Sequence, residues 1–216
     1  VTTGAPTALM DRPAVNHAVG RNQKVCMTLQ HGGTIYADDG KPAAGAIGET
    51  LRNLREIAPT VYFNVPTGFE MIADAMKTDA ALRKNLLSKV RMFFYSGAGL
   101  SQPVWDSLHA TQEAELGERI VMATGLGMTE SAPSAMFVNS IDVKAGDIGA
   151  PVPGMTLKLV PVDGKTEVRY RGPNVTPGYW RSDAATRDAF DEEGYLCTGD
   201  AVLWIDPDNI HRGLKF

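Results

Sequence analysis

Apolar positions in the first two thirds of the chain alternate between short continuous runs and helical repeats. Over residues 44–58 they recur at helical spacing, and Pro59 stops the helix. The apolar run at 61–63 is typical of a buried strand, and residues 91–95 form a further predicted strand. Further strands are predicted at 34–37 and 120–123 and further helices at 68–77, 79–88 and 101–116, while 25–29 is either a short strand or a short helix. This alternation predicts an α/β fold with a mostly parallel sheet flanked by helices, up to about residue 145.

After that point the period of the pattern changes. Residues 155–160 and 166–171 alternate between apolar and polar side chains, and Asp163-Gly164 lies between them, which predicts a hairpin with one wet face. The run Gly-Ala-Pro-Val-Pro-Gly at 149–154 interrupts every periodicity. We therefore expect residues 1–148 to form the α/β part of one large domain, and residues 149–216 to form a small β-rich, barrel-like subdomain of it.

The composition is that of an ordinary globular chain. Of 216 residues, 44% are hydrophobic and 21% charged, and 21 basic against 25 acidic side chains give a net charge of −4, which offers no reason to expect nucleic acid. No apolar run approaches the about 20 residues of a membrane helix, and the N-terminus lacks a secretory pattern, so no membrane partner is expected. Cys26 and Cys197 are far apart and outside any CxxC, which favours a reducing cytoplasm over a disulfide framework or a zinc site.

Several well-known signatures are missing from the sequence. It contains no GxxxxGKS/T, no GxGxxG, no GxSxG and no HExxH, and its four histidines show no metal-ligand spacing. P-loop, Rossmann, α/β-hydrolase and zincin interpretations therefore lose their support.

Residues 124–130, Thr-Gly-Leu-Gly-Met-Thr-Glu, are the strongest candidate for ligand binding. They follow a predicted strand, and their glycines allow a ligand to approach the backbone closely. A hydroxyl followed by a carboxylate suits a phosphate oxygen beside its divalent cation. Taken alone, the segment more often represents a glycine-rich turn with a capping Thr and a solvated Glu.

Two further segments contain candidate features, and a third does not. Residues 95–99 lie at the end of a predicted strand, where open α/β sheets place ligands, and Asp200 after Gly199 can accept both hydroxyls of a ribose. Each of these two also fits an ordinary turn. In residues 171–180 no side chain has an obvious chemical role, and we interpret this segment as a structural loop packed under aromatic residues.

Together and in this order, the segments resemble the adenylate-forming superfamily of acyl- and aryl-CoA synthetases, luciferases and peptide-synthetase adenylation domains. The matching blocks are SGAG (96–99), GLGMTE (125–130), GAPVPG (149–154), EVRYRGPNVTPGYW (167–180) and DEEGYLCTGD (191–200). Within the superfamily, Asn16-His17 and the blocks 31–36, 49–55 and 64–66 are most similar to enzymes of the feruloyl-CoA-synthetase type, which act on aryl acids.

The resemblance implies an ATP-dependent acid–thiol ligase that couples a feruloyl-like aromatic acid to CoA through an acyl-adenylate, with ATP and CoA as co-substrates and Mg²⁺ as cofactor. Thr129 would hold the α-phosphate and Glu130 the magnesium ion, as the catalytic pair. The implied nucleotide-binding residues are Ser96, Gly97, Ala98, Gly99, Gly125, Leu126, Gly127, Met128, Thr129 and Asp200, and the implied acid pocket comprises His17, Gly99 and Gly125. We expect Ser96–Gly99, Gly125–Glu130 and Asp200 to converge on one cleft.

The chain also departs from the family pattern. Thr7 stands where the family's phosphate loop, which only residues 2–6 resemble, has a lysine, and Leu126 stands where an aromatic residue usually faces the adenine. The chain stops before the family's hinge and C-terminal domain, so we expect a piece of a longer enzyme that alone makes no acyl-CoA at a useful rate. A carrier-protein acceptor, a non-catalytic nucleotide- or aryl-acid-binding fragment, and a homodimer remain open.

Overall fold

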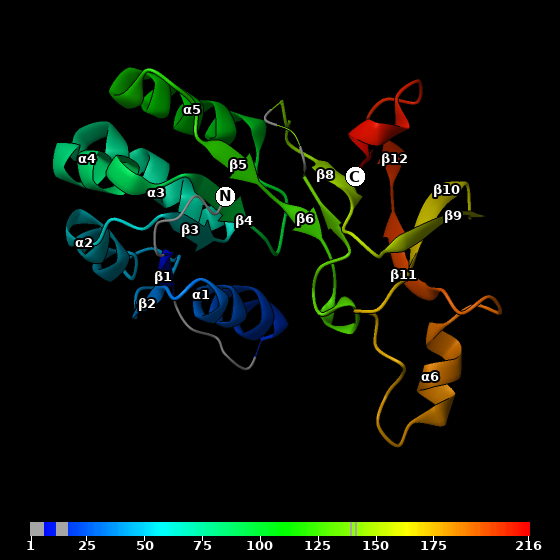
Figure 1. The fold of residues 1–216 in the computed structure, drawn as a ribbon. Coiled ribbons are helices and arrows are strands. Elements are labelled where there is room, and N and C mark those ends of the chain that lie inside the picture. Colours follow the sequence, from blue (N-terminus) through cyan, green and yellow to red (C-terminus); the bar gives the residue numbers. More distant parts are fainter. Residues whose placement is uncertain (1–6, 12–16, 139, 141) are drawn as a thin grey trace. The chain divides into compact units, whose positions relative to one another are not determined.

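The structure, a computed structural model, describes residues 7–11, 17–138, 140 and 142–216 (Figure 1). It divides into two compact units, Val1–Ala123 and Thr124–Phe216, which we call the first and the second unit. This division falls earlier than the boundary expected near residues 149–154. The reason is that β7 (Met136–Phe137) pairs antiparallel with both β6 (Gly125–Leu126) and β8 (Asp147–Pro151), which draws residues 124–148 into the later sheet.

The first unit is built on a five-stranded sheet in the order β2-β1-β3-β4-β5, in which every strand pair is parallel. The expected α/β fold class is thereby confirmed, and the four strands predicted in this region are found within one residue of their expected ends. One further strand, β1, was not predicted. The strands are β1 (Ala8–Asp11), β2 (Thr34–Ala37), β3 (Val61–Asn64), β4 (Met92–Tyr95) and β5 (Val121–Ala123).

Helices connect these strands. The segment 25–29, left open between strand and helix, is helical, and the helix expected from residue 44 begins at Gly48 because residues 44–47 form a turn. The helices are a π-helix (Val19–Val25), α1 (Cys26–Gln30), α2 (Gly48–Glu56), α3 (Pro66–Thr78), α4 (Ala80–Lys89) and α5 (Gln102–Leu116).

Aromatic side chains fill both faces of the parallel sheet, because successive residues of a strand point to opposite sides. Tyr62 and Phe93 make edge-to-face contacts with Phe69 of α3, with ring centroids 5.8 and 5.7 Å away. On the other face Phe63 contacts Phe94, and Lys24 of the π-helix lies 5.4 Å from the Phe63 ring centre. Figure 1 accordingly shows α3, α4 and α5 on one side of this sheet and α1 on the other. This two-sided burial accounts for the continuous apolar runs in the sequence.

A buried carboxylate joins the end of β2 to α2. Asp38 is buried and accepts hydrogen bonds from Thr50 Oγ1 at 2.5 Å, Asn53 Nδ2 at 2.9 Å and the Gly40 backbone N–H at 3.3 Å. Three donors satisfy a charge that would otherwise be expensive to bury. The loop after β2 is therefore fixed to the first turns of α2.

The second unit contains two antiparallel sheets, ordered β11-β10-β9 and β12-β13-β8-β7-β6. The predicted hairpin is confirmed, and both turn residues have positive φ, 48° at Asp163 and 77° at Gly164, as a tight two-residue turn requires. The hairpin is formed by β9 (Thr156–Val162) and β10 (Lys165–Arg171). The second unit also contains β11 (Leu196–Ala201), β12 (Leu203–Trp204), β13 (Leu214–Lys215), α6 (Asp183–Ala189) and the 3₁₀ turns Thr129–Ser131 and Ile210–Arg212.

One hydrophobic core is common to both sheets of the second unit. Val168 and Tyr170 of β10 and Leu196 of β11 meet Met136 of β7 and Ile148 of β8 there, and all are at most 3% exposed. Strand pairing among the described residues gives two sheets on one core rather than a single closed barrel. Across the described residues of both units, no helix is long and apolar enough to cross a membrane.

Replacing Asp38 by Ala should lower the free energy of unfolding by about 1.5–3 kcal/mol, because the hydroxyl, amide and N–H donors around it lose a charged acceptor. Denaturant titration followed by tryptophan fluorescence measures the change. The neighbouring Asp39 is exposed, so Asp39→Ala should change stability by less than about 0.5 kcal/mol. Equal effects of the two substitutions would contradict the assignment of Asp38 as a structural carboxylate.

Candidate functional site

The predicted phosphate- and metal-binding residues lie on a 3₁₀ turn, Thr129–Ser131, in the second unit. Ser131 Oγ accepts the Met128 backbone N–H at 3.0 Å, and Ala132 ends the turn with a positive φ of 56°. Thr129 is exposed and Glu130 is half-buried. Among the described residues, no hydrogen bond is recorded for the Thr129 hydroxyl or for Glu130 Oε2. Both groups are thus available for an external partner.

A loop from much later in the chain contacts this turn. Asn174 Nδ2 donates to the carbonyl oxygens of Ser131 and Ser134, at 2.7 and 2.5 Å. The Thr176 backbone N–H donates to the Glu130 carbonyl at 2.7 Å, and the Tyr179 hydroxyl donates to Glu130 Oε1 at 2.8 Å. The hydrogen bond to Glu130, aided by burial, raises the pKa of Tyr179.

Our interpretation of residues 171–180 as a loop without chemically active side chains missed these contacts. The partners are 40 to 49 positions apart in sequence. No local pattern reports a contact over that separation, and the only sequence signal was the stiffness given by Pro173 and Pro177.

The glycines before the turn are needed by the chain itself. A Cβ atom at Gly125 would overlap the carbonyl oxygen of Met136 on the paired strand β7, and one at Gly127 would overlap the carbonyl oxygen of Pro133. We had predicted that they admit a ligand to the backbone. Close packing of backbone on backbone already requires glycine at both positions.

Asp200 lies in a β-bulge. Strands β10 and β11 pair Glu167 with Ala201 and Arg169 with Cys197, so that four steps along β11 match two along β10. Bulges of this kind bend a strand and change the direction of a side chain, and they are frequent beside binding sites. The Thr-Gly-Asp sequence is therefore an irregular segment within a strand, and not the simple turn that its composition also fitted.

Side chains satisfy the backbone of this bulge. Thr198 Oγ1 donates to the Val168 carbonyl at 2.5 Å and accepts the Asp200 N–H at 3.0 Å, while Glu167 Oε1 accepts the Gly199 N–H at 2.9 Å. Gly199 has a φ of 72°, a conformation that favours glycine. The carboxylate of Asp200 itself is left without a recorded hydrogen bond among the described residues.

The electrostatic surroundings of Asp200 disfavour its charged form. Burial first, and then the negative charge of Glu167, raise the pKa of Asp200 above its ordinary value of 3.8. Burial also acts to raise the pKa of Glu167, but hydrogen bonds from the Gly199 N–H and Arg169 outweigh it and lower that pKa. Nearby, the fully buried Tyr170 hydroxyl has no partner in the described part of the chain, and burial followed by the charge of Asp200 raises its pKa.

A charge network fixes the loop that leads into β11. Asp191 Oδ2 accepts from Lys158 Nζ at 2.9 Å and Arg169 Nη1 at 3.1 Å, while Oδ1 accepts the Tyr195 N–H at 2.9 Å. The Lys158 hydrogen bond, followed by the Tyr195 N–H, holds the pKa of Asp191 well below its usual range. Asp191 is thus a structural carboxylate, in contrast to Asp200.

Among the candidate residues of the first unit, Ser96 is half-buried and the others are exposed. Ser96 donates its backbone N–H to the Asn64 carbonyl at 3.3 Å, and Gly97, Ala98 and Gly99 form an exposed loop after β4, with a φ of 90° at Gly97. His17 is exposed, and its Nδ1 accepts the Val19 N–H at 3.3 Å.

The structure leaves two expectations from the sequence untested: the role of Asn16 and the phosphate-loop-like segment, and the convergence of the candidate residues on one cleft. Asn16 and the phosphate-loop-like residues 2–6 lie outside the described residues; Thr7, which follows them, is buried, and its carbonyl accepts the Thr34 N–H at 2.8 Å. The residues 96–99 belong to the first unit, whereas 125–130 and Asp200 belong to the second. Their convergence on one cleft therefore stays a prediction.

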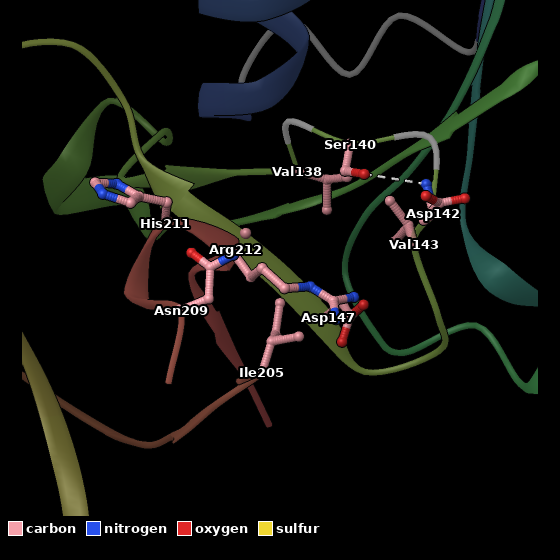
Figure 2. A pocket seen from close by; sticks show the side chains of 10 residues that line it. Val138, Ser140, Asp142, Val143, Asp147, Ile205, Asn209, His211 and Arg212 are labelled. Carbon is pink, nitrogen blue, oxygen red and sulfur yellow. Dashed lines mark hydrogen bonds between the residues drawn. The ribbon is translucent and has the colours of Figure 1, made fainter. Parts of the chain in front are cut away.

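The second unit has a cavity of about 180 Å³, and none of the predicted site residues lines it. Figure 2 shows it between β8, the loop before β8 and the 3₁₀ turn Ile210–Arg212. There the Arg212 side chain points toward Asp147, and Ser140 Oγ accepts the Asp142 N–H at 3.1 Å. In the part of the chain that the structure describes, no group of three or more His, Cys, Asp or Glu side chains could hold a metal ion.

Comparison with known proteins identifies the class. The family described as AMP-binding enzyme matches residues 13–180, and the chain therefore belongs to that family. It is 32% identical over 169 residues to a probable 4-coumarate–CoA ligase 1 of Dictyostelium discoideum, an alignment covering 74% of this chain and 29% of the relative. It is 28% identical to a human long-chain-fatty-acid–CoA ligase 1, with 83% of this chain and 31% of the relative covered. The chain thus spans less than a third of the length of these curated relatives.

The fold is also found in solved structures. A malonyl-CoA ligase, solved as a ternary product complex with methylmalonyl-CoA and AMP, superposes with a TM-score of 0.73 at 29% identity. The match covers 97% of this chain and 43% of that one. A long-chain-fatty-acid–CoA ligase of Archaeoglobus fulgidus reaches a TM-score of 0.76 at 16% identity and shows the shared fold.

Replacing Gly127 by Ala should destabilise the chain by about 1–3 kcal/mol, because the added methyl group overlaps a backbone carbonyl that cannot move independently. Thermal and denaturant unfolding measure the loss. Gly99→Ala is the matched control, since a Cβ there meets open space and should change stability by less than about 0.5 kcal/mol. A Gly127→Ala protein as stable as the Gly99→Ala protein would refute the packing explanation.

Proposed function

We propose that this chain contributes nucleotide- and acid-binding residues to an ATP-dependent carboxylic acid–CoA ligase, acting on an aromatic, feruloyl-like acid. In the proposed reaction the carboxylate attacks the α-phosphorus of ATP, which gives an acyl-adenylate and pyrophosphate. The thiol of CoA then displaces AMP and forms the thioester. Membership of the AMP-binding family and the names of the relatives support the reaction class, and the His17 and 31–36 blocks support an aryl acid.

The observation that carries the proposal is the carboxylate of Asp200. It is half-buried on a bulge whose backbone is otherwise satisfied, and no hydrogen bond is recorded for it among the described residues. A ribose offers two adjacent hydroxyls that a carboxylate can accept together, as in other nucleotide sites. In this role Asp200 orients the nucleotide through its sugar.

Thr129 and Glu130 are assigned to the phosphate end of the nucleotide. The exposed Thr129 hydroxyl donates to an α-phosphate oxygen, and the free Oε2 of Glu130 is a hard oxygen ligand that fits Mg²⁺. Magnesium, when bound, supplies charge neutralisation at the phosphates. The glycine-containing residues 96–99 and His17 are assigned to the adenine and acid contacts, with CoA as the acceptor.

Removing the Asp200 carboxylate should weaken AMP binding about ten- to hundredfold, since hydrogen bonds to a charged group contribute roughly 1.5–3 kcal/mol. Calorimetric titration of Asp200→Ala with AMP measures the loss, and Asp200→Asn, which keeps one acceptor oxygen, should fall between it and the parent. Asp208→Ala removes an exposed carboxylate and should bind like the parent. If Asp200→Ala binds AMP as tightly as the parent, the ribose assignment is wrong.

The same assignment predicts a pH dependence. Only ionised Asp200 accepts two hydroxyls, and its pKa is raised, so affinity should decline as the pH falls through that raised pKa. The decline should begin at a higher pH than an ordinary Asp would give. Adenosine is the appropriate ligand because it has no phosphate to titrate. Fluorescence titration of the parent should show this decline, whereas a similar decline in Asp200→Asn would assign it to another group.

A further inference from the structure

Residues 174–179 make four hydrogen bonds to the segment 130–134, which carries Glu130. Among the described residues, their other hydrogen bonds stay within their own loop or reach α6 and the residue before it. Two of the four bonds, from Asn174, end on the carbonyls of Ser131 and Ser134. Two more, from Thr176 and Tyr179, end on the backbone and on the side chain of Glu130. We call residues 174–179 the brace, because they fix both the turn and its carboxylate.

The brace is itself held rigidly at the end that carries Tyr179. The Tyr179 N–H donates to Thr186 Oγ1 at 2.9 Å, and that hydroxyl donates to the Ser182 carbonyl at 3.0 Å at the start of α6. Gly178 has a φ of 147°, and a Cβ there would meet Thr186 Oγ1 at 2.8 Å. The hydroxyl of Tyr179 is therefore presented from a fixed backbone.

The chemistry of this contact leaves the carboxylate free to do something else. A carboxylate offers about four lone-pair sites, and the Tyr179 hydroxyl occupies only one of them, on Oε1. A phenol is a neutral donor, so it orients the carboxylate without cancelling its charge. A Lys or Arg in the same place would neutralise that charge. The remaining sites, including all of Oε2, keep the full negative charge that a hard divalent cation requires.

We propose that Tyr179 is a positioning residue that holds the Glu130 carboxylate in the orientation needed to bind the divalent cation of a metal–nucleotide complex. This inference rests on the proposed function for its ligand but concerns a residue to which the nucleotide assignment gave no part. Tyr179 acts through Glu130 alone. Its loss frees a side chain with several rotatable bonds, which must then be immobilised when the metal binds.

The contact itself can be tested without any ligand. The chain has six tyrosines, so labelling with 3-fluorotyrosine gives a small set of ¹⁹F resonances, and the one that disappears in Tyr179→Phe is that of Tyr179. Glu130→Gln should shift this resonance and leave that of Tyr36, an exposed tyrosine of the first unit, unchanged. A Tyr179 resonance that does not respond to Glu130→Gln overturns the proposal.

The functional consequence is tested with Mn²⁺–ATP, using the electron paramagnetic resonance of free Mn²⁺ to count bound metal, and with AMP without metal. Tyr179→Phe should weaken Mn²⁺–ATP binding about two- to tenfold and leave AMP binding unchanged. Glu130→Gln should weaken Mn²⁺–ATP binding at least as much. The double variant should be no weaker than Glu130→Gln, because Tyr179 has nothing left to position. Tyr36→Phe, the matched loss of an exposed hydroxyl, should bind both ligands like the parent.

Three results overturn the positioning role. One is parent-like Mn²⁺–ATP binding by Tyr179→Phe while Glu130→Gln is weakened, and another is an undiminished effect of Tyr179→Phe in the Glu130→Gln background. The third is an equal loss of AMP and Mn²⁺–ATP binding in Tyr179→Phe, which indicates a general loosening of the unit. If the parent chain binds neither ligand, it is the proposed function that fails, and the fluorine experiment alone then supports or overturns the positioning of Glu130.

Discussion

The carbonyl oxygens of Glu130, Ser131 and Ser134 belong to no regular helix or sheet ladder, and an irregular backbone must find partners for such groups. The Asn174 amide donates to Ser131 and Ser134 and the Thr176 N–H to Glu130, while the Ser134 N–H gives the Ser131 carbonyl a second, local bond at 2.9 Å. This requirement fixes the shape of the turn, and the shape of the turn fixes where a hydroxyl at 129 and a carboxylate at 130 are offered. The second unit can place chemically active groups on an exposed turn because a distant loop completes its hydrogen bonding.

Much of the first unit could be predicted from the sequence because its sheet is buried on both faces. Residues 61–63 and 92–95 are apolar without interruption, and Tyr62 and Phe63 show why, since they pack against opposite layers. The strand β1 escaped prediction because four residues, Ala8–Asp11, contain too little pattern to distinguish a strand. The π-helix escaped for a different reason: its backbone bonding has no sequence period of its own.

The candidate site was predictable as a set of segments but not as a set of contacts. Gly-Leu-Gly-Met-Thr-Glu and Thr-Gly-Asp can be recognised from the sequence alone, because both place glycine beside polar side chains next to a predicted strand. That Gly127 packs against the Pro133 carbonyl, or that Asp200 lies in a bulge, depends on register between strands. Register is decided by the whole core of a unit, and the brace around Tyr179 depends on it in the same way.

The bulge in β11 also limits how related chains can diverge in length. Side chains alternate along a strand, so inserting or deleting one residue next to the bulge would exchange the two faces and turn Asp200 or Leu196 to the wrong side. The tip of the β9–β10 hairpin tolerates changes in length, because Asp163 and Gly164 are exposed and lie between the two strands. Changes of length during evolution should therefore accumulate at the hairpin tip, while the strand that carries the carboxylate keeps its count of residues.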